Sequence, residues 1–270
     1  MTRWMQDPRH LQIVTLAGML AYGLGWLDFP GPSWLLLIYP LSALLFQWLL
    51  GCLAGLPFDP RSALISSFSL CLLLHTDTWR WAVFAAAVTI GSKFVLRVAG
   101  RHVFNPSCLA IVVTLLATDR VWVSPGQWGL GVFLAFAAVC MGLWVLHHTR
   151  RSDVTLAFLA AWSTLLFGRA LWLGDPWSIP LLQLQNVSLL IFAFFMISDP
   201  KTLPDRCLAR IGFVLVVAVT AYVLQYHCYV NEGLFFALAL CAPLVPLLNR
   251  WLPGKRFDWP APASPAFSRR

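Results

Sequence analysis

The stretch of the sequence most able to do chemistry runs from residue 92 to residue 110. Lys93, Arg97 and Arg101 follow one another at intervals of four residues, so a continuous helix would carry them in one stripe. Arginines near a membrane surface extend to the lipid headgroups, which is one explanation of Arg97 and Arg101. Lys93 lies about two turns deeper, where an unpaired cation is costly. We expect Lys93 to meet a ligand, a carboxylate or a carbonyl of a broken helix.

The end of the same stretch combines a histidine with a helix start. Asn105 followed by Pro106 is the pattern of an N-cap acceptor and a first helical residue that lacks an N–H. His102 precedes Asn105 by three residues, so both can face the same side of this joint. His102 is either a hydrogen-bonded loop residue or a cofactor partner. Haem is disfavoured, because the six histidines lie mostly at the ends of predicted helices.

Two further joints carry polar residues. In residues 194–206, Asp199 precedes a proline as a second cap, with Thr202 close behind it. In residues 231–249, Glu232 heads a predicted helix, where a carboxylate interacts favourably with the helix dipole. Each residue is explained by a turn or a cap, and each is also a candidate to complete a pocket.

The cysteines and the composition exclude several classes of protein. Seven cysteines are scattered, with no C-x-x-C pair and no His/Cys cluster, so we expect no metal site. The chain is 59% hydrophobic and 11% charged, whereas a soluble domain carries about 25% charged residues. The net charge of +8 does not indicate a nucleic-acid partner, because the basic residues crowd the loops of one membrane side.

The elements that position these residues are predicted membrane segments of an all-α integral membrane protein. The inner loops of a ten-segment topology hold fifteen of the nineteen basic residues, which places both termini in the cytoplasm. We expect a cytoplasmic N-terminus (1–10), a single transmembrane domain (11–250) and a disordered cytoplasmic tail (251–270). The ten segments are 11–29, 34–56, 62–75, 79–100, 106–117, 127–147, 153–173, 181–197, 209–226 and 232–248.

Irregular segments recur at corresponding places in the two halves of the chain. Segments 62–75 and 106–117 are too short to cross a bilayer comfortably. The eighth segment begins after Pro180, and the tenth contains Pro243 and Pro246. Short or broken helices at matching positions predict two inverted five-helix repeats, about 11–120 and 127–250, with a site where the broken helices meet.

The three polar joints resemble those of the NqrB/RnfD family, which comprises the NqrB component of the sodium-translocating NADH:quinone reductase and the RnfD component of the Rnf electron-transport complex. The likeness covers most of the chain in order, and residues 62–74 also resemble the third helix of the family. The residues that match the family motifs are Lys93, Gly100, His102, Phe104, Asn105 and Pro106, then Phe195, Met196, Asp199, Pro200, Thr202 and Pro204, then Glu232, Gly233, Phe236, Ala237, Pro246 and Leu247.

The resemblance implies the inverted-repeat fold of ammonium and urea channels and flavins within the membrane. Typical members carry a non-covalent riboflavin and an FMN esterified to threonine in an S/D-G-A-T motif. Thr118 lies in the corresponding region of this sequence without those neighbours, so covalent FMN is not expected. The expected cofactor is a non-covalent riboflavin or FMN.

We therefore expect an electron-transfer protein of a bacterial inner (plasma) membrane, with a flavin held near the cytoplasmic side. The flavin would perform the redox chemistry while the protein sets its potential. A redox partner protein or other membrane subunits would deliver the electrons. A transporter or channel for a small solute or a flavin, and a non-catalytic assembly subunit, are the alternatives. The candidate cofactor-binding residues are Lys93, Arg97, Arg101, His102, Asn105, Asp199, Thr202 and Glu232.

Overall fold

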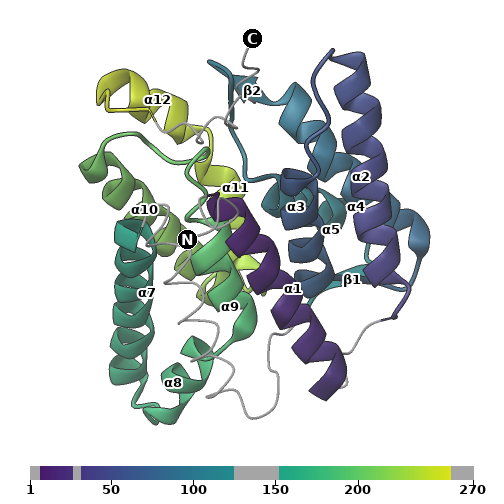
Figure 1. The fold of residues 1–270 in the computed structure, drawn as a ribbon. Coiled ribbons are helices and arrows are strands. Elements are labelled where there is room, and N and C mark those ends of the chain that lie inside the picture. The colour runs from purple at the N-terminus through teal and green to yellow at the C-terminus, as the bar shows by residue number, and fades with distance from the viewer. Residues whose placement is uncertain (1–6, 27–31, 125–151, 257–270) are drawn as a thin grey trace.

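The computed structural model describes residues 7–26, 32–124 and 152–256, and most of them are helical (Figure 1). The predicted sixth segment, 127–147, lies outside the described residues. The helices are α1 (Pro8–Trp26), α2 (Leu35–Leu53), α3 (Arg61–Leu73), α4 (Trp79–Val95), α5 (Pro106–Ala117), α7 (Ser152–Leu173), α8 (Ser178–Leu184), α9 (Val187–Ile191), α10 (Cys207–Tyr226), α11 (Gly233–Cys241) and α12 (Leu244–Trp251), and a π-helical turn, η2 (Phe192–Met196), continues α9.

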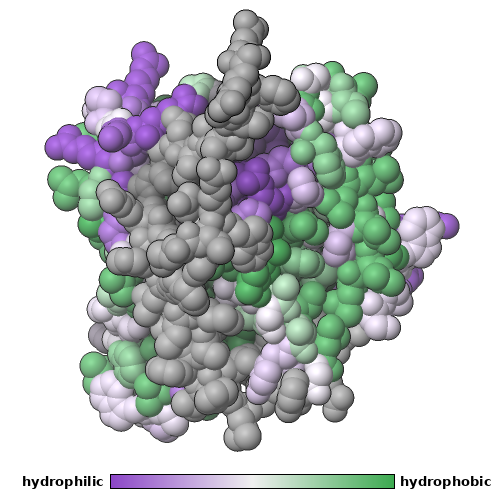
Figure 2. Space-filling view, in the orientation of Figure 1, coloured by the Kyte–Doolittle hydropathy of each residue, from purple (hydrophilic) through white to green (hydrophobic). Residues whose placement is uncertain are grey.

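Helix length and surface composition identify a membrane protein. Over the described residues, α2, α7 and α10 are long and apolar enough to cross a membrane, and two bent helix pairs raise that number from three to as many as five. Leu37, Leu41 and Leu45 are 66%, 64% and 53% exposed along one stripe of α2. Figure 2 shows this apolar surface on the side of α2. Such a stripe is unfavourable in water and suits contact with lipid.

The predicted irregular segments are confirmed. The helices α3 and α5 have 13 and 12 residues and lie at the centre, where α3 packs against α1, α2 and α5. The eighth segment is broken between α8 and α9 with a bend of 51°, and the tenth between α11 and α12 with a bend of 44°. The two halves show similar packing. In the first half, α2 packs on α4, and α4 also packs on α5. In the second half, α7 packs on α10, and α10 also packs on α11.

Short strands add to the predicted all-helical architecture. The strands β1 (Leu74–Thr76) and β4 (Val121–Val123) pair antiparallel, and so do β2 (Arg97–Val98) and β3 (Arg101–His102). The first pair ties the end of α3 to the chain that follows α5. The second pair is a hairpin between α4 and α5, which aims the start of α5 toward the protein centre.

The predicted stripe of three cations on one helix is wrong. The helix α4 ends at Val95 rather than near residue 100. Ala99 and Gly100 form the turn of the β2–β3 hairpin, with φ of 51° and 77°. Two successive positive φ values belong to a hairpin turn that glycine favours and a helix cannot contain. Arg97 and Arg101 therefore lie on paired strands, and only Lys93 belongs to α4.

Two asparagines start the central helices. The Oδ1 atom of Asn105 accepts a hydrogen bond from the Cys108 N–H at 3.1 Å, and Pro106 is the first residue of α5, as predicted. The Oδ1 atom of Asn186 accepts bonds from the Ser188 and Leu189 N–H groups at 2.8 and 3.2 Å and starts α9. Asn186 was not predicted.

The end of the described chain packs against the loop that precedes α10. The helix α12 extends to Trp251, and Gly254 lies against the backbone of Asp205 and Arg206. A Cβ atom at position 254 would meet the Arg206 nitrogen at 2.8 Å, so only glycine permits this approach. Residues 257–270 lie outside the described part of the chain.

Candidate functional site

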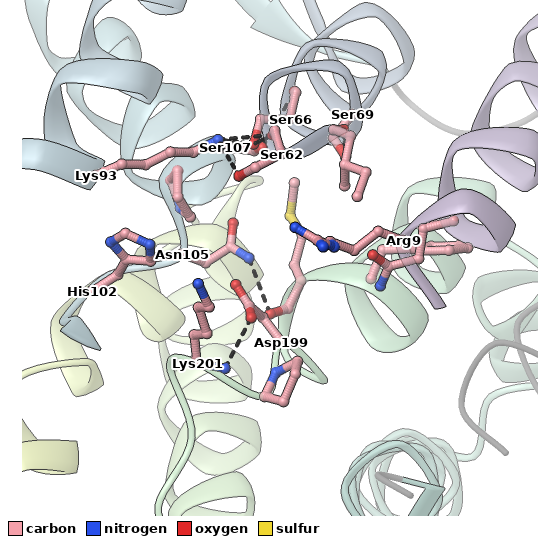
Figure 3. Close-up of a pocket in the computed structure, with 16 residues that line it drawn as sticks. Arg9, Ser62, Ser66, Ser69, Lys93, His102, Asn105, Ser107, Asp199 and Lys201 are labelled. Carbon is pink, nitrogen blue, oxygen red and sulfur yellow. Dashed lines mark hydrogen bonds between the residues drawn. The ribbon is translucent and has the colours of Figure 1, made fainter. Parts of the chain in front are cut away.

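A pocket opens between the first and second halves of the chain, near the end of the molecule that carries β2, β3 and α12. We call it the inner pocket (Figure 3). The end of α4, the starts of α3 and α5, and the segment after η2 converge there. Its polar lining consists of Arg9, Gln12, Ser62, Ser66, Ser69, Lys93, His102, Asn105, Ser107, Asp199 and Lys201, with Ile65, Pro106, Phe195, Met196 and Pro200 as apolar neighbours.

Lys93 is buried in the wall of this pocket, with 6% of its surface exposed. Its Nζ atom donates to the Ser62 carbonyl at 2.8 Å, to the Ser62 hydroxyl at 3.0 Å and to the Ser66 hydroxyl at 2.9 Å. All three acceptors are neutral, and no ion pair of Lys93 occurs among the described residues. The carbonyl that it meets belongs to the first turn of α3. Hydrogen bonds thus stabilise the ammonium group, but no carboxylate from residues 7–26, 32–124 or 152–256 contacts it to balance its charge.

Asn105 joins the two halves of the chain at the pocket. It is 7% exposed, and its Nδ2 group donates to the Met196 carbonyl at 3.3 Å. Met196 ends the π-helical turn η2, in which the Ile197 N–H reaches the Phe192 carbonyl at 2.9 Å. A wider helical turn changes which carbonyls face the neighbouring helices, and such turns are frequent at functional sites.

His102 faces the same pocket as a neutral imidazole. Burial, followed by the positive charges of Lys201, Arg97 and Lys93, lowers the pKa of His102 to about 3. Its Nδ1 atom is buried without a hydrogen-bond partner in the described part of the chain. His102 can therefore exchange a hydrogen bond with a ligand but does not supply a positive charge near neutral pH.

Asp199 and Thr202 belong to one turn. Asp199, Pro200 and Lys201 line the pocket, whereas Thr202 does not. The Asp199 Oδ1 atom accepts from the Lys201 N–H at 3.0 Å, and the Thr202 hydroxyl donates to the Asp199 carbonyl at 3.2 Å. Thr202 is 6% exposed and holds the turn rather than lining the pocket.

The structure thus brings four of the eight predicted residues, Lys93, His102, Asn105 and Asp199, to one pocket. Thr202 lies next to the pocket without lining it, and the remaining three predicted residues, Arg97, Arg101 and Glu232, lie elsewhere. Arg97 is exposed on β2. Arg101 forms an ion pair with Asp205 at 2.8 Å, and both side chains are largely buried. Glu232 lines a different pocket at the other end of the protein.

A row of hydroxyls in α3 was not predicted. Ser62, Ser66 and Ser69 are spaced four and three residues apart, so they share one face of the helix, and all three line the inner pocket. The spacing was visible in the sequence. What the sequence did not show is that Lys93, from another helix, donates to this row.

A group of ion pairs between α1 and α3, which the sequence analysis did not predict, lies at the edge of the pocket beside α1. The triplet Asp-Pro-Arg occurs at residues 7–9 and again at 59–61. The Arg9 guanidinium contacts Asp59 at 2.9 Å, and the Arg61 guanidinium contacts Asp7 at 2.7 Å. Each arginine also bonds the aspartate of its own triplet. We call these four residues the α1–α3 clamp. It fixes the start of α1 against the start of α3, with Arg9 in the pocket wall.

The clamp holds both of its carboxyl groups ionised. Burial by itself would raise the pKa of Asp7, but the hydrogen bonds from Arg9 and the charges of Arg9 and Arg61 lower it below the ordinary 3.8. Burial and the same two arginines act in the same way on the pKa of Asp59.

A second pocket, which we call the outer pocket, lies near the start of α9, whereas the inner pocket lies near the end of η2. Its volume is about 330 Å³, against about 90 Å³ for the inner pocket. The residues that line it are Val123, Ser124, Trp162, Gln183, Asn186, Ser188, Leu189, Gln225, Tyr226, Asn231, Glu232, Leu234 and Phe235.

Long apolar helices, short central helices and a polar pocket between the two halves define a helical membrane protein with an internal polar pocket. The model of the NQR2, RnfD, RnfE family matches residues 122–258, which is 137 of the 270 residues. The chain belongs to this family, as the three joints predicted. Its members are membrane subunits of electron-transport complexes. No curated protein matches the chain.

Proposed function

We propose that the protein is an electron-transfer subunit that holds a non-covalent flavin, riboflavin or FMN, at the inner pocket. The observation that carries the proposal is Lys93. Its ammonium group is buried beside the joint between the two halves, and the atoms that bond to it in the described part of the chain are all neutral. A buried cation without a contacting carboxylate favours a ligand that gains negative charge.

Each pocket residue has a role that follows from its contacts. A bound flavin supplies the electron-transfer chemistry, which amino-acid side chains lack. Lys93 raises the electrostatic potential at the pocket and so favours the reduced, anionic form. His102 offers a hydrogen bond through its unpartnered Nδ1 atom. Phe195 and Met196 form an apolar wall for an aromatic ring. Thr118 caps the end of α5, where its hydroxyl accepts from the Arg120 N–H, and it has no part in this proposal.

The inner pocket is too small for a flavin as it stands, so flavin binding requires the pocket to widen. A volume of about 90 Å³ is below the roughly 300 Å³ of the smallest usual ligand pockets. The pocket wall that can move as a unit is the start of α1, because the α1–α3 clamp holds it there by ion pairs rather than by covalent connection. We propose that flavin enters as the clamp opens and α1 moves away from α3.

The ten-segment, inverted-repeat architecture is part of the same proposal. Equivalent packing in the two halves supports it, because α2–α4–α5 corresponds to α7–α10–α11. The basic loops at the end with β2, β3 and α12 favour that end as cytoplasmic in a bacterial inner membrane, with both termini there. Other membrane subunits would deliver or receive the electrons.

The test is to purify the protein with its native membrane partners and to identify any flavin by visible absorption and mass spectrometry. Lys93→Met should lose the flavin or lower its midpoint potential. Lys255→Met, which removes an exposed lysine at the same end, should change neither. Flavin-free wild-type protein, or Lys93→Met protein with unchanged flavin content and potential, would contradict the proposal.

A transporter of a small solute is the second candidate function. It is favoured by the two pockets at opposite ends of the α9–η2 run, with the buried rings of Phe192 and Phe235 in edge contact between them. Solute flux into proteoliposomes without any redox partner would support the transporter and argue against an obligatory electron-transfer role.

A further inference from the structure

The outer pocket differs from the inner pocket in place and in charge. Asn186, at the start of α9, lines the outer pocket, and Met196, at the end of η2, lines the inner one. Met196 follows Asn186 by ten positions, which corresponds to roughly 15 Å along a helix. Within the described part of the chain, no lysine, arginine or histidine lines the outer pocket, whereas the inner pocket contains Lys93 and other basic residues.

Among the described residues that line the outer pocket, Glu232 carries the charge. This carboxylate is partly exposed at the start of α11, and among the described residues it has neither a hydrogen bond nor an ion pair. Arg169, which contacts the pocket residue Tyr226, lies over that ring at 4.6 Å and pairs with Asp175 at 3.5 Å. The carboxylate of Glu232 is therefore available to a cationic ligand.

Around Glu232 the pocket combines amide oxygens with aromatic rings. Gln183 and Gln225 contribute carboxamides, and the Tyr226 hydroxyl donates to the Gln183 Oε1 atom at 3.1 Å, which orients both groups. Trp162 and Phe235 form the deep wall, each 3% exposed. Aromatic faces attract cations, and quaternary ammonium groups are recognised by such surfaces.

The volume distinguishes between kinds of cation. About 330 Å³ falls within the range of small-molecule pockets, which begins at roughly 300 Å³. It is far larger than a single ion needs. No group of three histidine, cysteine, aspartate or glutamate side chains that could hold a metal ion occurs in the residues described.

We propose that the outer pocket binds a small organic ammonium compound, with Glu232 as the counter-ion and Trp162 and Phe235 as the aromatic surface. The site is independent of the inner pocket, because the two share no lining residue. It therefore holds whether or not the inner pocket binds flavin.

The experiment measures binding of choline, and of its uncharged carbon isostere dimethylbutanol, to the whole protein in lipid nanodiscs by calorimetry. Wild-type protein should bind choline more tightly than the isostere. Glu232→Gln should weaken choline binding by about tenfold or more, because it removes the charge and keeps the shape. Asp77→Asn is the matched control, since Asp77 is an exposed carboxylate at the same end outside the pocket, and it should bind choline as the wild type does.

A second variant covers the case in which Glu232→Gln does not fold. Gln225→Glu adds a carboxylate to the pocket lining and should tighten choline binding. Three results would overturn the proposal: no choline binding by folded wild-type protein, equal binding of choline and its isostere, or unchanged choline binding in both folded Glu232→Gln and folded Gln225→Glu.

Discussion

The α1–α3 clamp offers the sharpest test of the energetics of this fold. Asp7→Asn, Arg61→Met and the double variant form a double-mutant cycle on a contact of 2.7 Å, in which the two side chains are 17% and 27% exposed. Exposed ion pairs contribute about 0.2–1 kcal/mol. Since this pair is partly buried and belongs to a network of four charges, we expect a coupling free energy near the upper limit, about 1 kcal/mol.

The assay is reversible unfolding in mixed detergent micelles, followed by tryptophan fluorescence at neutral pH. The control cycle uses Asp77 and Arg120, a pair at 3.4 Å with side chains 52% and 67% exposed. Solvent screens that pair, so its coupling should be close to zero. The two cycles together separate the clamp from a general effect of charge removal.

The clamp coupling should also depend on pH with a defined sign. The folded-state pKa values of Asp7 and Asp59 lie below the ordinary 3.8. The stabilisation is therefore fully present above about pH 3.8, where the unfolded carboxyls are also ionised, and is lost as the pH falls through the lower folded-state values. A clamp coupling no larger than that of the control pair, or one that increases on acidification, would refute the reasoning.

Three other substitutions test the packing and the inner pocket. Gly233→Ala should destabilise the protein by about 1–3 kcal/mol, because the added methyl group would meet the Ala221 carbonyl of α10 at 3.0 Å; chemical denaturation measures the loss, and an unchanged stability would mean that α11 shifts freely. Asn105→Ala removes the cap of α5 and the bond to Met196 and should cost about 1–2 kcal/mol, whereas Asn105→Asp should restore the cap but not the bond. The pKa of His102 lies near 3 in the folded protein and at 6.5 in the unfolded chain, so stability should be greatest above pH 6.5 and decrease as the pH falls toward 3. His102→Asn should flatten that decrease, and an unchanged pH profile would show that the imidazole is solvated.

Several local features of the fold could be predicted because neighbouring residues decide them. Asn105 and Pro106 start α5 at the predicted position, since an N-cap and a residue without an N–H act within one helical turn. The short third and fifth segments followed from apolar length, and the break in the tenth segment lies at Pro243, as the sequence indicated. The eighth segment breaks at Gln185 and Asn186 rather than at Pro180, which lies within α8. The family prediction is confirmed by the match over residues 122–258, a range that includes two of the three joints.

Other features depended on competition between local structures. Lys93, Arg97 and Arg101 have helical spacing, yet Ala99 and Gly100 form a hairpin turn in the middle of that spacing. Periodicity alone gave the wrong structure, because a two-residue turn with positive φ at Ala99 and Gly100 cannot be part of a continuous helix.

The membrane character, the irregular central helices and the family were determined by the sequence alone, because composition, capping residues and apolar length act locally. Only the tertiary structure decided which polar groups meet. The bonds from Lys93 to Ser62 and Ser66 join positions 31 and 27 residues apart, and the bond from Asn105 to Met196 spans 91 residues. Glu232 was assigned to the inner site by motif, but the direction of α11 carries it to the other end of the protein. Such encounters depend on how helices from distant parts of the chain pack, which no local pattern encodes.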